Sequence, residues 1–251
     1  MRIGIAGTTG RMGRLLVEEV REAGCVLAGG TSRTGPPADV PHFPDVEALA
    51  AASDCVVDFT HASLVQPHAS AVAGAGAAWV LGTSGLSAAD EAAVAEAARR
   101  VPVVHAANFA PGVTLLLTLA ERLGAALPPG EYDAEILEMH HRQKVDAPSG
   151  TALALGRAVA AGRGVRLADA MESGRNGHTG PRKPGAIGFA ALRGGQVVGE
   201  HTLLFASASE HIALSSRVLD RRVFAQGAVQ AALWTRGRDA GLYGMTAVLG
   251  L

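Results

Sequence analysis

The sequence has few charged residues for its length. Asp, Glu, Lys and Arg make up 18 % of the 251 residues, against roughly 25 % in an average globular protein, and the formal net charge is −1. This low charge content excludes a chain that stays disordered because its charges repel one another. The 22 Lys and Arg form no run, so we expect no nucleic-acid partner, and any basic patch is local and suited to a small anion.

Cysteines are scarce, and long apolar runs and a signal peptide are missing. The only cysteines, Cys25 and Cys55, lie in apolar runs that predict strands, so we expect reduced core residues. No apolar run reaches the roughly 18 residues that a bilayer requires. The chain enters an apolar segment at Ile3 without the core of a signal peptide. These features predict a cytoplasmic protein with no membrane partner.

Glycine, by contrast, is abundant: 32 residues, about 13 % against a norm of about 7 %. The first hundred residues alternate short apolar runs with helix-like segments, which predicts a parallel sheet covered on both faces. We expect strands at Arg2–Ala6, Cys25–Gly29, Cys55–Phe59, Ala78–Leu81 and Val103–Ala106, and helices at Arg11–Ala23, Ser63–Ala75 and Ala88–Arg100.

The pattern changes after residue 110, which predicts a second, α+β domain over 111–219 with a mixed or antiparallel sheet. The segment from 220 to 251, a helix and a short apolar tail, is expected to return to the first domain, 1–110. The elements expected are a helix at Gly112–Leu127, a weak strand at Glu131–His141, a helix at Pro148–Ala161 capped by Ser149, a loop at Ala168–Pro184, strands at Gly188–Arg193, Val197–Ala206 and His211–Val218 that short connections make antiparallel neighbours, and a helix at Arg221–Arg238.

A glycine-rich turn, Gly7-Thr8-Thr9-Gly10-Arg11-Met12-Gly13, follows the first strand and opens the first helix. That context is typical of a dinucleotide-binding domain, where glycines permit the tight turn and let backbone N–H groups approach a pyrophosphate. The spacing departs from the usual G-x-G-x-x-G pattern because Thr9 occupies the middle position. A turn with a purely structural role is the alternative.

The end of the second strand predicts which nicotinamide nucleotide binds. An acid at that place bonds the 2′-hydroxyl of NAD, but the segment Gly30–Thr34 contains no carboxylate. Ser32 and Arg33 suit a 2′-phosphate better, because a guanidinium pairs with phosphate through charge-assisted hydrogen bonds. We therefore expect NADPH to be preferred and NADH to be possible; a solvated loop arginine is the alternative.

Small and hydroxyl residues close the next three strands, where a parallel sheet lines its ligand crevice. They would let a nicotinamide approach, and the side chain of Asn108 could bond its carboxamide. These candidates are Phe59, Thr60, Gly82, Thr83, Ser84, Ala106, Ala107, Asn108 and Phe109.

The stretch from Glu138 to Thr151 contains the highest density of side chains that could bind anions or transfer protons. His140, His141, Arg142 and Lys144 lie within five residues, and Pro148-Ser149-Gly150-Thr151 then starts a helix. A helix N-terminus with free N–H groups favours a carboxylate. No nearby cysteine or third histidine completes a zinc set, so we expect no metal. A solvated basic loop is the alternative interpretation.

These motifs together resemble the family of 4-hydroxy-tetrahydrodipicolinate reductase, also called dihydrodipicolinate reductase. The resemblance covers nearly the whole chain, and His-His-x-x-Lys-x-Asp-x-Pro-Ser-Gly-Thr over residues 140–151 is highly specific to that family. The motifs that carry it are Gly10–Gly13, Asp58–Thr60, Gly82–Gly85, Ala107–Phe109, His140–Thr151, Gly177–Gly180, Gly185–Phe189 and Gly199–Thr202.

The resemblance implies a Rossmann-type domain, a substrate domain and a homotetramer formed through the sheet of the latter. It also implies reduction of a hydroxylated dicarboxylate with NADH or NADPH in the diaminopimelate route to lysine. His140 matches the proton donor/acceptor and Lys144 the proton donor. The positions that hold substrate carboxylates are His141, Lys144, Ser149, Gly150 and Thr151; the cofactor segments are Gly7–Met12, Gly82–Ser84 and Ala106–Phe109.

Some positions depart from the family pattern. Ser32 replaces an acid that members often carry while Arg33 stays, which favours NADPH; Thr9, His61 and Gln143 also differ from frequent family residues. Two other functions share the glycine turn: a nicotinamide oxidoreductase acting on a sugar or amino acid, and a non-catalytic NADP sensor. Neither requires the stretch from Lys144 to Thr151.

Overall fold

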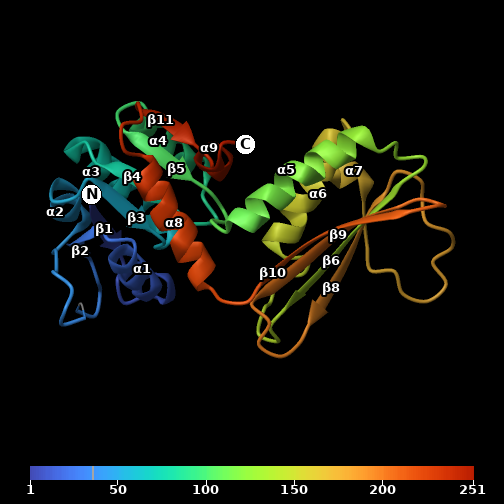
Figure 1. Ribbon diagram of the computed structural model, residues 1–251, viewed down its shortest axis with the longest axis horizontal. Coiled ribbons are helices and arrows are strands. Elements are labelled where there is room, and N and C mark those ends of the chain that lie inside the picture. The colour runs from blue at the N-terminus through green and yellow to red at the C-terminus, as the bar shows by residue number, and fades with distance from the viewer. Residues whose placement is uncertain (36) are drawn as a thin grey trace. The chain divides into compact units, whose positions relative to one another are not determined.

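The structure, a computed structural model, describes residues 1–35 and 37–251 (Figure 1). They form two compact units, each with its own sheet. Met1–Pro111 and Arg222–Leu251 make up the first unit, and Gly112–Arg221 the second. No helix in these described stretches is long and apolar enough to cross a membrane.

The first unit contains a six-stranded parallel sheet in the order β11-β5-β4-β3-β1-β2. Its apolar residues divide between two cores, one on each face of the sheet. Ile3 and Ile5 pack with α1 and α8 on one face, while α2, α3 and α4 cover the other. The strands are β1 Arg2–Ala6, β2 Val26–Gly30, β3 Cys55–Asp58, β4 Ala78–Leu81, β5 Pro102–His105 and β11 Gly241–Tyr243; the helices are α1 Arg11–Glu22, α2 Val46–Ala51, η1 Ala62–Leu64, α3 Val65–Ala75, α4 Ala88–Ala98, α8 Arg222–Trp234 and α9 Met245–Leu249.

The strand order of this sheet reverses at β1, which lies between β2 and β3. Ligands of such sheets bind beyond the carboxyl ends of the strands at this reversal, and the glycine turn follows β1 there. The apolar tail docks in the same unit, because β11 pairs in parallel with β5. The predicted parallel α/β architecture is confirmed.

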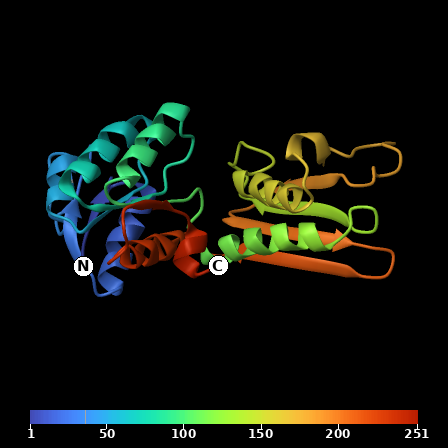
Figure 2. The ribbon, with the colours of Figure 1, turned by 90° about the horizontal axis from the view of Figure 1, so that it is seen from above.

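The second unit contains a mixed five-stranded sheet in the order β10-β9-β6-β8-β7. Helices α5 and α6 cover one face and share its apolar core with β6, β8 and β9 (Figure 2). The two helices approach closely, because a Cβ at Gly124 would lie 2.6 Å from the carbonyl oxygen of Val159. The elements are α5 Pro111–Ala126, β6 Asp133–His140, α6 Gly150–Gly162, α7 Leu167–Ala170, β7 Met171–Ser173, β8 Ile187–Arg193, β9 Gly199–Ala206 and β10 His211–Val218.

The expected order of the last strands is wrong in one place. β9 and β10 are antiparallel neighbours as expected, but β8 and β9 are not paired. Strand β6 lies between them, parallel to β8 and antiparallel to β9. A short connection favours pairing between the two strands that it joins. Here, however, the connection between β8 and β9 crosses one intervening strand. The pairing is therefore decided by β6, some fifty residues earlier in the chain.

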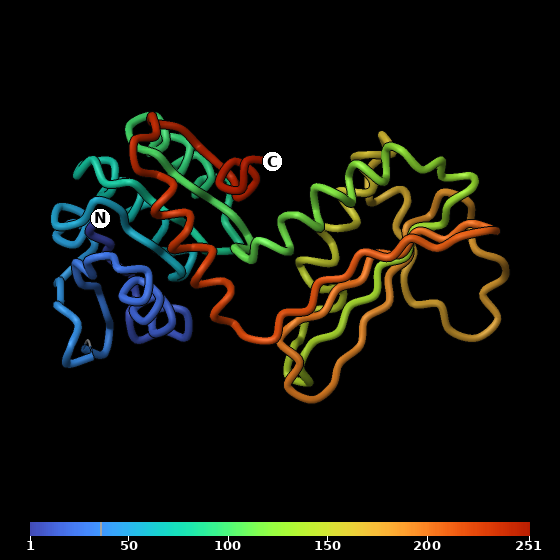
Figure 3. Tube along the Cα trace, viewed as in Figure 1, coloured from blue at the N-terminus to red at the C-terminus, as the bar shows by residue number. Residues whose placement is uncertain are grey.

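The loop expected at Ala168–Pro184 is also wrong in its first part. Residues 167–170 form α7, and Met171–Ser173 form β7, which pairs in parallel with β8. Leu167 packs beside Gly156 of α6, where a Cβ would lie 3.1 Å from its side chain. These short elements depend on such tertiary contacts rather than on local periodicity. The rest, residues 174–186, is irregular and forms the wide connection to β8 (Figure 3).

Two further features of the first unit were not anticipated. Helix α2 is absent from the expected elements; it begins after Asp45, whose carboxylate accepts a hydrogen bond from Ala48 N at 2.8 Å. Cys25 lies just before β2 and is only half-buried, so its assignment to the core of a strand is wrong, whereas Cys55 is buried in β3.

Close packing of α8 gives a test of this fold. A Cβ at Gly227 would lie 1.8 Å from the carbonyl oxygen of Phe109, a backbone atom that cannot move aside cheaply. Gly227→Ala should therefore lower the free energy of unfolding by about 2 kcal/mol or more, although alanine favours helix. Gly74→Ala in α3 is the matched control, because its Cβ would meet nothing within 4 Å. Urea unfolding should show it unchanged or up to about 1 kcal/mol more stable; equal effects of both changes would contradict the packing of α8.

Candidate active site

The glycine turn between β1 and α1 leaves space for a ligand at a helix N-terminus. Gly7 has φ +80°, which favours glycine, and Gly10 N donates to Gly7 O at 3.1 Å. Gly10 is the N-cap of α1 and supplies no side chain to cap its first N–H groups. A Cβ at Gly13 would lie 2.1 Å from Gly7 O, so the helix can start this close to the strand only with glycine there. This arrangement fits a pyrophosphate.

A chain of hydroxyl groups connects this turn to the segment after β2. Thr34 Oγ1 lies 3.5 Å from Thr9 Oγ1, Thr9 Oγ1 lies 3.2 Å from Ser32 Oγ, and Ser32 donates to Gly35 O at 2.9 Å. Thr8 is buried, and its hydroxyl donates to Thr31 O at 3.3 Å. Arg11 and Arg33 are both exposed beside these groups in sequence. Thr9, which departs from the common glycine pattern, thus fixes the loop that carries Ser32.

A buried carboxylate, Asp58, organises the carboxyl ends of the next strands. Its oxygens accept hydrogen bonds from Thr60 N at 2.8 Å, from Thr60 Oγ1 at 2.7 Å and from His68 Nδ1 at 2.6 Å. Thr83 Oγ1 in turn donates to Thr60 O at 3.1 Å. The loops after β3 and β4 are thereby tied together. Neither Asp58 nor His68 was among the predicted site residues.

The remaining residues of the predicted cofactor site occupy the same edge of the sheet. The rings of Phe59 and Phe109 lie 5.3 Å apart, and a Cβ at Gly82 would lie 2.2 Å from Phe59. Asn108 Oδ1 accepts a hydrogen bond from Ala110 N at 2.8 Å, and this bond stabilises the backbone turn after β5. Ala106 is half-buried, whereas Ser84 and Ala107 are exposed.

The second group of predicted residues surrounds another buried carboxylate, Glu138, in the second unit. His140 ends β6 on the face covered by α6, and its Nδ1 lies 2.5 Å from Glu138 Oε2. Ser149, the N-cap of α6, donates its backbone N–H to Glu138 Oε1 at 3.1 Å. Arg193 at the end of β8 donates to both carboxylate oxygens at 2.8 Å. The sequence predicted His140 and Ser149 here, but not Glu138 or Arg193.

Lys144 is joined to the same cluster through Asp146. Its Nζ lies 2.9 Å from Asp146 Oδ1, and Arg193 Nη2 donates to the Asp146 carbonyl at 2.5 Å. Gly150 opens α6 with no atom within 4 Å of a Cβ built on it, so space lies beside the first helical turn. Thr151 is half-buried in that turn. His141 is half-buried and its Nδ1 has no hydrogen-bond partner within the described stretches.

A second imidazole, His201 of β9, completes the cluster and was not among the site residues that the sequence motifs predicted. Its Nε2 lies 3.0 Å from Ser149 Oγ, and its ring meets that of His140 edge-on at 5.1 Å between centroids. His201 follows Gly199 in a Gly-x-His pattern that contributed only to the family resemblance. Alternation along β9, which places both residues on the helix-covered face, is the signal that could have found it.

Burial sets the charges of the cluster. Burial pushes the pKa of Glu138 upward, but hydrogen bonds from Arg193, His140 and Ser149 outweigh it and leave that pKa below its usual value. Burial lowers the pKa of His140, and Glu138 compensates only in part. Burial also lowers the pKa of His201, to about 4. At neutral pH, Glu138 is therefore ionised and both imidazoles are neutral, so the cluster can accept and pass protons.

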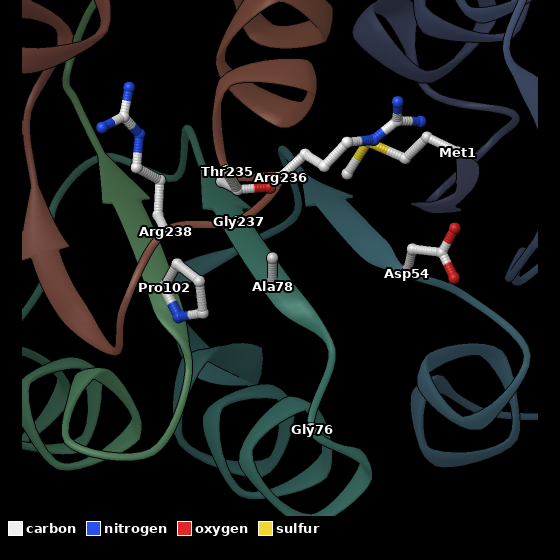
Figure 4. A pocket seen from close by; sticks show the side chains of 9 residues that line it. All are labelled: Met1, Asp54, Gly76, Ala78, Pro102, Thr235, Arg236, Gly237 and Arg238. Carbon is white, nitrogen blue, oxygen red and sulfur yellow. The ribbon is translucent and has the colours of Figure 1, made fainter.

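The first unit also has a pocket that neither group of residues lines. It has a volume of about 310 Å³ and is lined by residues such as Met1, Asp54, Ala78 and Pro102, which precede or begin strands β1, β3, β4 and β5 (Figure 4). Because the amino ends of parallel strands share one edge, this pocket lies opposite the edge that carries the glycine turn. Within residues 1–35 and 37–251, no group of three or more His, Cys, Asp and Glu could hold a metal ion.

Comparison with known proteins identifies the family. Residues 1–109 match the family model described as Dihydrodipicolinate reductase, N-terminus, and residues 112–249 match Dihydrodipicolinate reductase, C-terminus. The chain belongs to the dihydrodipicolinate reductase family. The resemblance inferred from the motifs is thus confirmed, and the chain is an oxidoreductase of a family that uses a nicotinamide cofactor.

Relatives within this family are similar over the full chain. A protein of Granulibacter bethesdensis named 4-hydroxy-tetrahydrodipicolinate reductase is 66 % identical, covering 100 % of this chain and 97 % of its own. One of the same name from Gluconacetobacter diazotrophicus is 64 % identical over 100 % and 98 %. A solved structure described as dipicolinate-bound dihydrodipicolinate reductase from Paenisporosarcina sp. TG-14 is 24 % identical and covers 97 % of each chain with a TM-score of 0.80, which supports the fold.

Proposed function

We propose that this chain reduces 4-hydroxy-tetrahydrodipicolinate to tetrahydrodipicolinate with a nicotinamide nucleotide, in the diaminopimelate route to lysine. The observation that carries the proposal is the end-to-end identity of 66 % with a reductase of that name. The cluster around Glu138 supports it, because Glu138 contacts both His140 and the start of α6, and Lys144 is linked to the same cluster through Asp146. A sugar dehydrogenase or a nucleotide sensor would need no such cluster.

In this proposal the two units have different functions. The first domain, 1–110 with 220–251 returning, binds the dinucleotide, and residues 111–219 bind the substrate and form the oligomer. The uncapped start of α1 and the close approach at Gly13 support the first assignment. The buried cluster on β6, β8, β9 and α6 supports the second. A cytoplasmic location remains a prediction.

The nucleotide would be held along the carboxyl edge of the first sheet. Bound there, the nicotinamide supplies a hydride to the substrate ring. Backbone N–H groups at the glycine turn would face the pyrophosphate, and the loops tied by Asp58 would face the nicotinamide. The residues concerned are Gly7, Thr8, Thr9, Gly10, Arg11, Met12, Ser32, Arg33, Phe59, Thr60, Gly82, Thr83, Ser84, Ala106, Ala107, Asn108 and Phe109.

The substrate carboxylates would be bound at the start of α6 and by the preceding loop. The N–H groups of Gly150 and Thr151 in the first turn provide donors and the positive end of the helix dipole, and Ser149 caps the helix beside them. Lys144 and His141 add further donors beside that turn. A planar dicarboxylate such as pyridine-2,6-dicarboxylate should occupy the same place, because it presents two carboxylates on one ring.

Proton transfer completes the reduction. Loss of the 4-hydroxyl group as water first gives a conjugated imine. Negative charge then develops on the ring of this imine as the carbon–hydrogen bond forms, and the ammonium group of Lys144 stabilises it. Lys144 delivers the proton that quenches this charge, and His140, neutral at rest, accepts and returns a proton. Asp146 holds Lys144 in the loop until substrate carboxylates compete for it.

NADPH is the preferred nucleotide in this proposal. The hydroxyl chain of Thr34, Thr9 and Ser32, together with Arg33, offers donors to a 2′-phosphate and no carboxylate to repel it. NADH lacks that phosphate, so Arg33 would add nothing to its affinity. NADH would still bind through the parts that the two nucleotides have in common.

A coupled assay tests the reaction. Pyruvate, aspartate semialdehyde and the preceding synthase generate the substrate, and the absorbance of NADPH is followed. Oxidation should occur only when the synthase is active, because the substrate is its product. Nucleotide binding without turnover under these conditions would support the sensor interpretation. Turnover with sugars or amino acids instead would support another oxidoreductase.

Cofactor choice is tested at Arg33. Arg33→Ala should raise the KM for NADPH by about tenfold or more and leave that for NADH nearly unchanged, since a charge-assisted hydrogen bond contributes roughly 1.5–3 kcal/mol. Arg100→Ala, another exposed arginine of the same unit, serves as the control and should alter neither constant. If Arg33→Ala affects both cofactors equally, Arg33 does not contact the 2′-phosphate.

Steady-state kinetics separate the roles of His140 and Lys144. Lys144→Ala should raise the KM for the substrate and lower kcat, because the ammonium binds a carboxylate and also donates the proton. His140→Ala should lower kcat by about 10² or more with a smaller effect on KM. Neither change should alter NADPH affinity measured by fluorescence. Near-normal kcat in both variants would refute these roles.

The assembly is proposed to be a homotetramer formed through the second sheet. The face opposite α5 and α6 exposes apolar side chains, including Leu137 at 44 % and Leu192 at 49 % exposure, which a partner sheet would cover. Sedimentation at micromolar protein should give the mass of four chains. Leu137→Lys should shift the mass towards smaller species, whereas a monomeric wild type would rule the assembly out.

A further inference from the structure

The carboxylate of Glu138 has all its acceptor positions occupied. Glu138 is 1 % exposed, and two donors meet each oxygen. Oε1 accepts from Ser149 N at 3.1 Å and Arg193 Nη2 at 2.8 Å. Oε2 accepts from Arg193 Nη1 at 2.8 Å and faces His140 Nδ1 at 2.5 Å. Since a carboxylate offers about four lone-pair sites, no acceptor capacity remains for water or substrate.

This arrangement determines which nitrogen of His140 carries its proton. An ionised carboxylate can only accept, so Nδ1 must donate to it. A neutral imidazole has a single N–H, and Nε2 is therefore left with its lone pair. Arg193 reinforces the assignment, because its two donors favour the ionised form of Glu138, which has no proton to donate to Nδ1.

Nε2 of His140 lies beside a position that only glycine leaves open. A Cβ at Gly199 of the neighbouring strand would approach Nε2 to 3.0 Å. His201, two residues further along β9, presents its ring to the edge of the His140 ring. Gly199 thus permits the ring orientation in which Nδ1 meets Glu138 and Nε2 points away from it.

We propose that Glu138 is a positioning residue, which holds His140 in the Nδ1–H tautomer and makes Nε2 the nitrogen that exchanges a proton with the substrate. The inference rests on the proposed function only for the identity of the substrate. Arg193 is the counter-ion that keeps Glu138 ionised, and the same guanidinium ties down the loop of Lys144 through the Asp146 carbonyl.

The charges around His140 come from each element packed against it. Burial lowers its pKa; Glu138 on its own strand raises it, while Lys144 of the loop and Arg193 of β8 lower it. His201 of β9 is neutral at neutral pH, and Ser149 of α6 is uncharged. Glu138 is the residue that raises the pKa of His140, so removing its charge should lower that pKa further.

Solid-state NMR of the full chain with ¹⁵N-labelled histidine tests the tautomer directly. The signals of His140 are assigned by their loss in His140→Asn. In the wild type at neutral pH, the proton should reside on Nδ1, with Nε2 unprotonated. A wild-type Nε2–H tautomer overturns the proposal without any variant at Glu138, and the result does not depend on whether the enzyme turns over its proposed substrate.

Glu138→Gln provides the second arm. The glutamine amide has one oxygen and one NH₂ group, so it cannot accept hydrogen bonds at both positions of the carboxylate. The Nε2–H tautomer of His140 should therefore become populated and the pKa of His140 should fall. The kcat should drop at least tenfold, while the affinity for NADPH stays unchanged. Glu135→Gln is the matched control on the same strand; Glu135 faces the other side of the sheet and pairs with Arg175 and Arg182. It should keep the wild-type spectrum and kcat. Retention of the Nδ1–H tautomer and of full kcat in Glu138→Gln would overturn the proposal.

Discussion

The ion pair between the buried carboxylate of Glu138 and the half-buried Arg193 is the interaction on which the site in the second unit depends. A charge is costly to bury unless it is paired and hydrogen-bonded, and breaking one side of such a pair costs about 3–5 kcal/mol. Here the pair joins β6 to β8 and also takes up the N–H at the start of α6. His140 and the proposed carboxylate-binding turn are thereby fixed to one carboxylate, and they cannot shift independently.

Asp58 plays a comparable part in the first unit. It is fully buried, and its contacts with Thr60 and His68 fix the loop after β3, to which Thr83 is then bonded. The two units therefore use the same device at the ends of parallel strands. A buried carboxylate, satisfied by donors from neighbouring segments, orders the short loops that carry the functional groups.

The parts of the fold and site that the sequence predicted are those that depend on local residues. The turn from Gly7 to Gly13 and the cap at Ser149 can be recognised from their own neighbours, because glycine and serine are required there by backbone geometry. Arg193 was not recognised, since it lies 55 residues from Glu138 and nothing in either local pattern marks them as partners. Strand β6 between β8 and β9, and the short β7, likewise follow from pairing across the chain. The assignment of single residues to cofactor or substrate contacts stays a prediction.

A crystal structure with pyridine-2,6-dicarboxylate tests the central claim most directly. One carboxylate should bind the N–H groups of Gly150 and Thr151 at the start of α6, and the ring should lie within reach of His140 Nε2 and Lys144. The contacts of Glu138 with Arg193, His140 and Ser149 should remain as they are here. A dicarboxylate bound away from residues 140–151, or a Glu138 that leaves Arg193 to contact the ligand, would contradict the account.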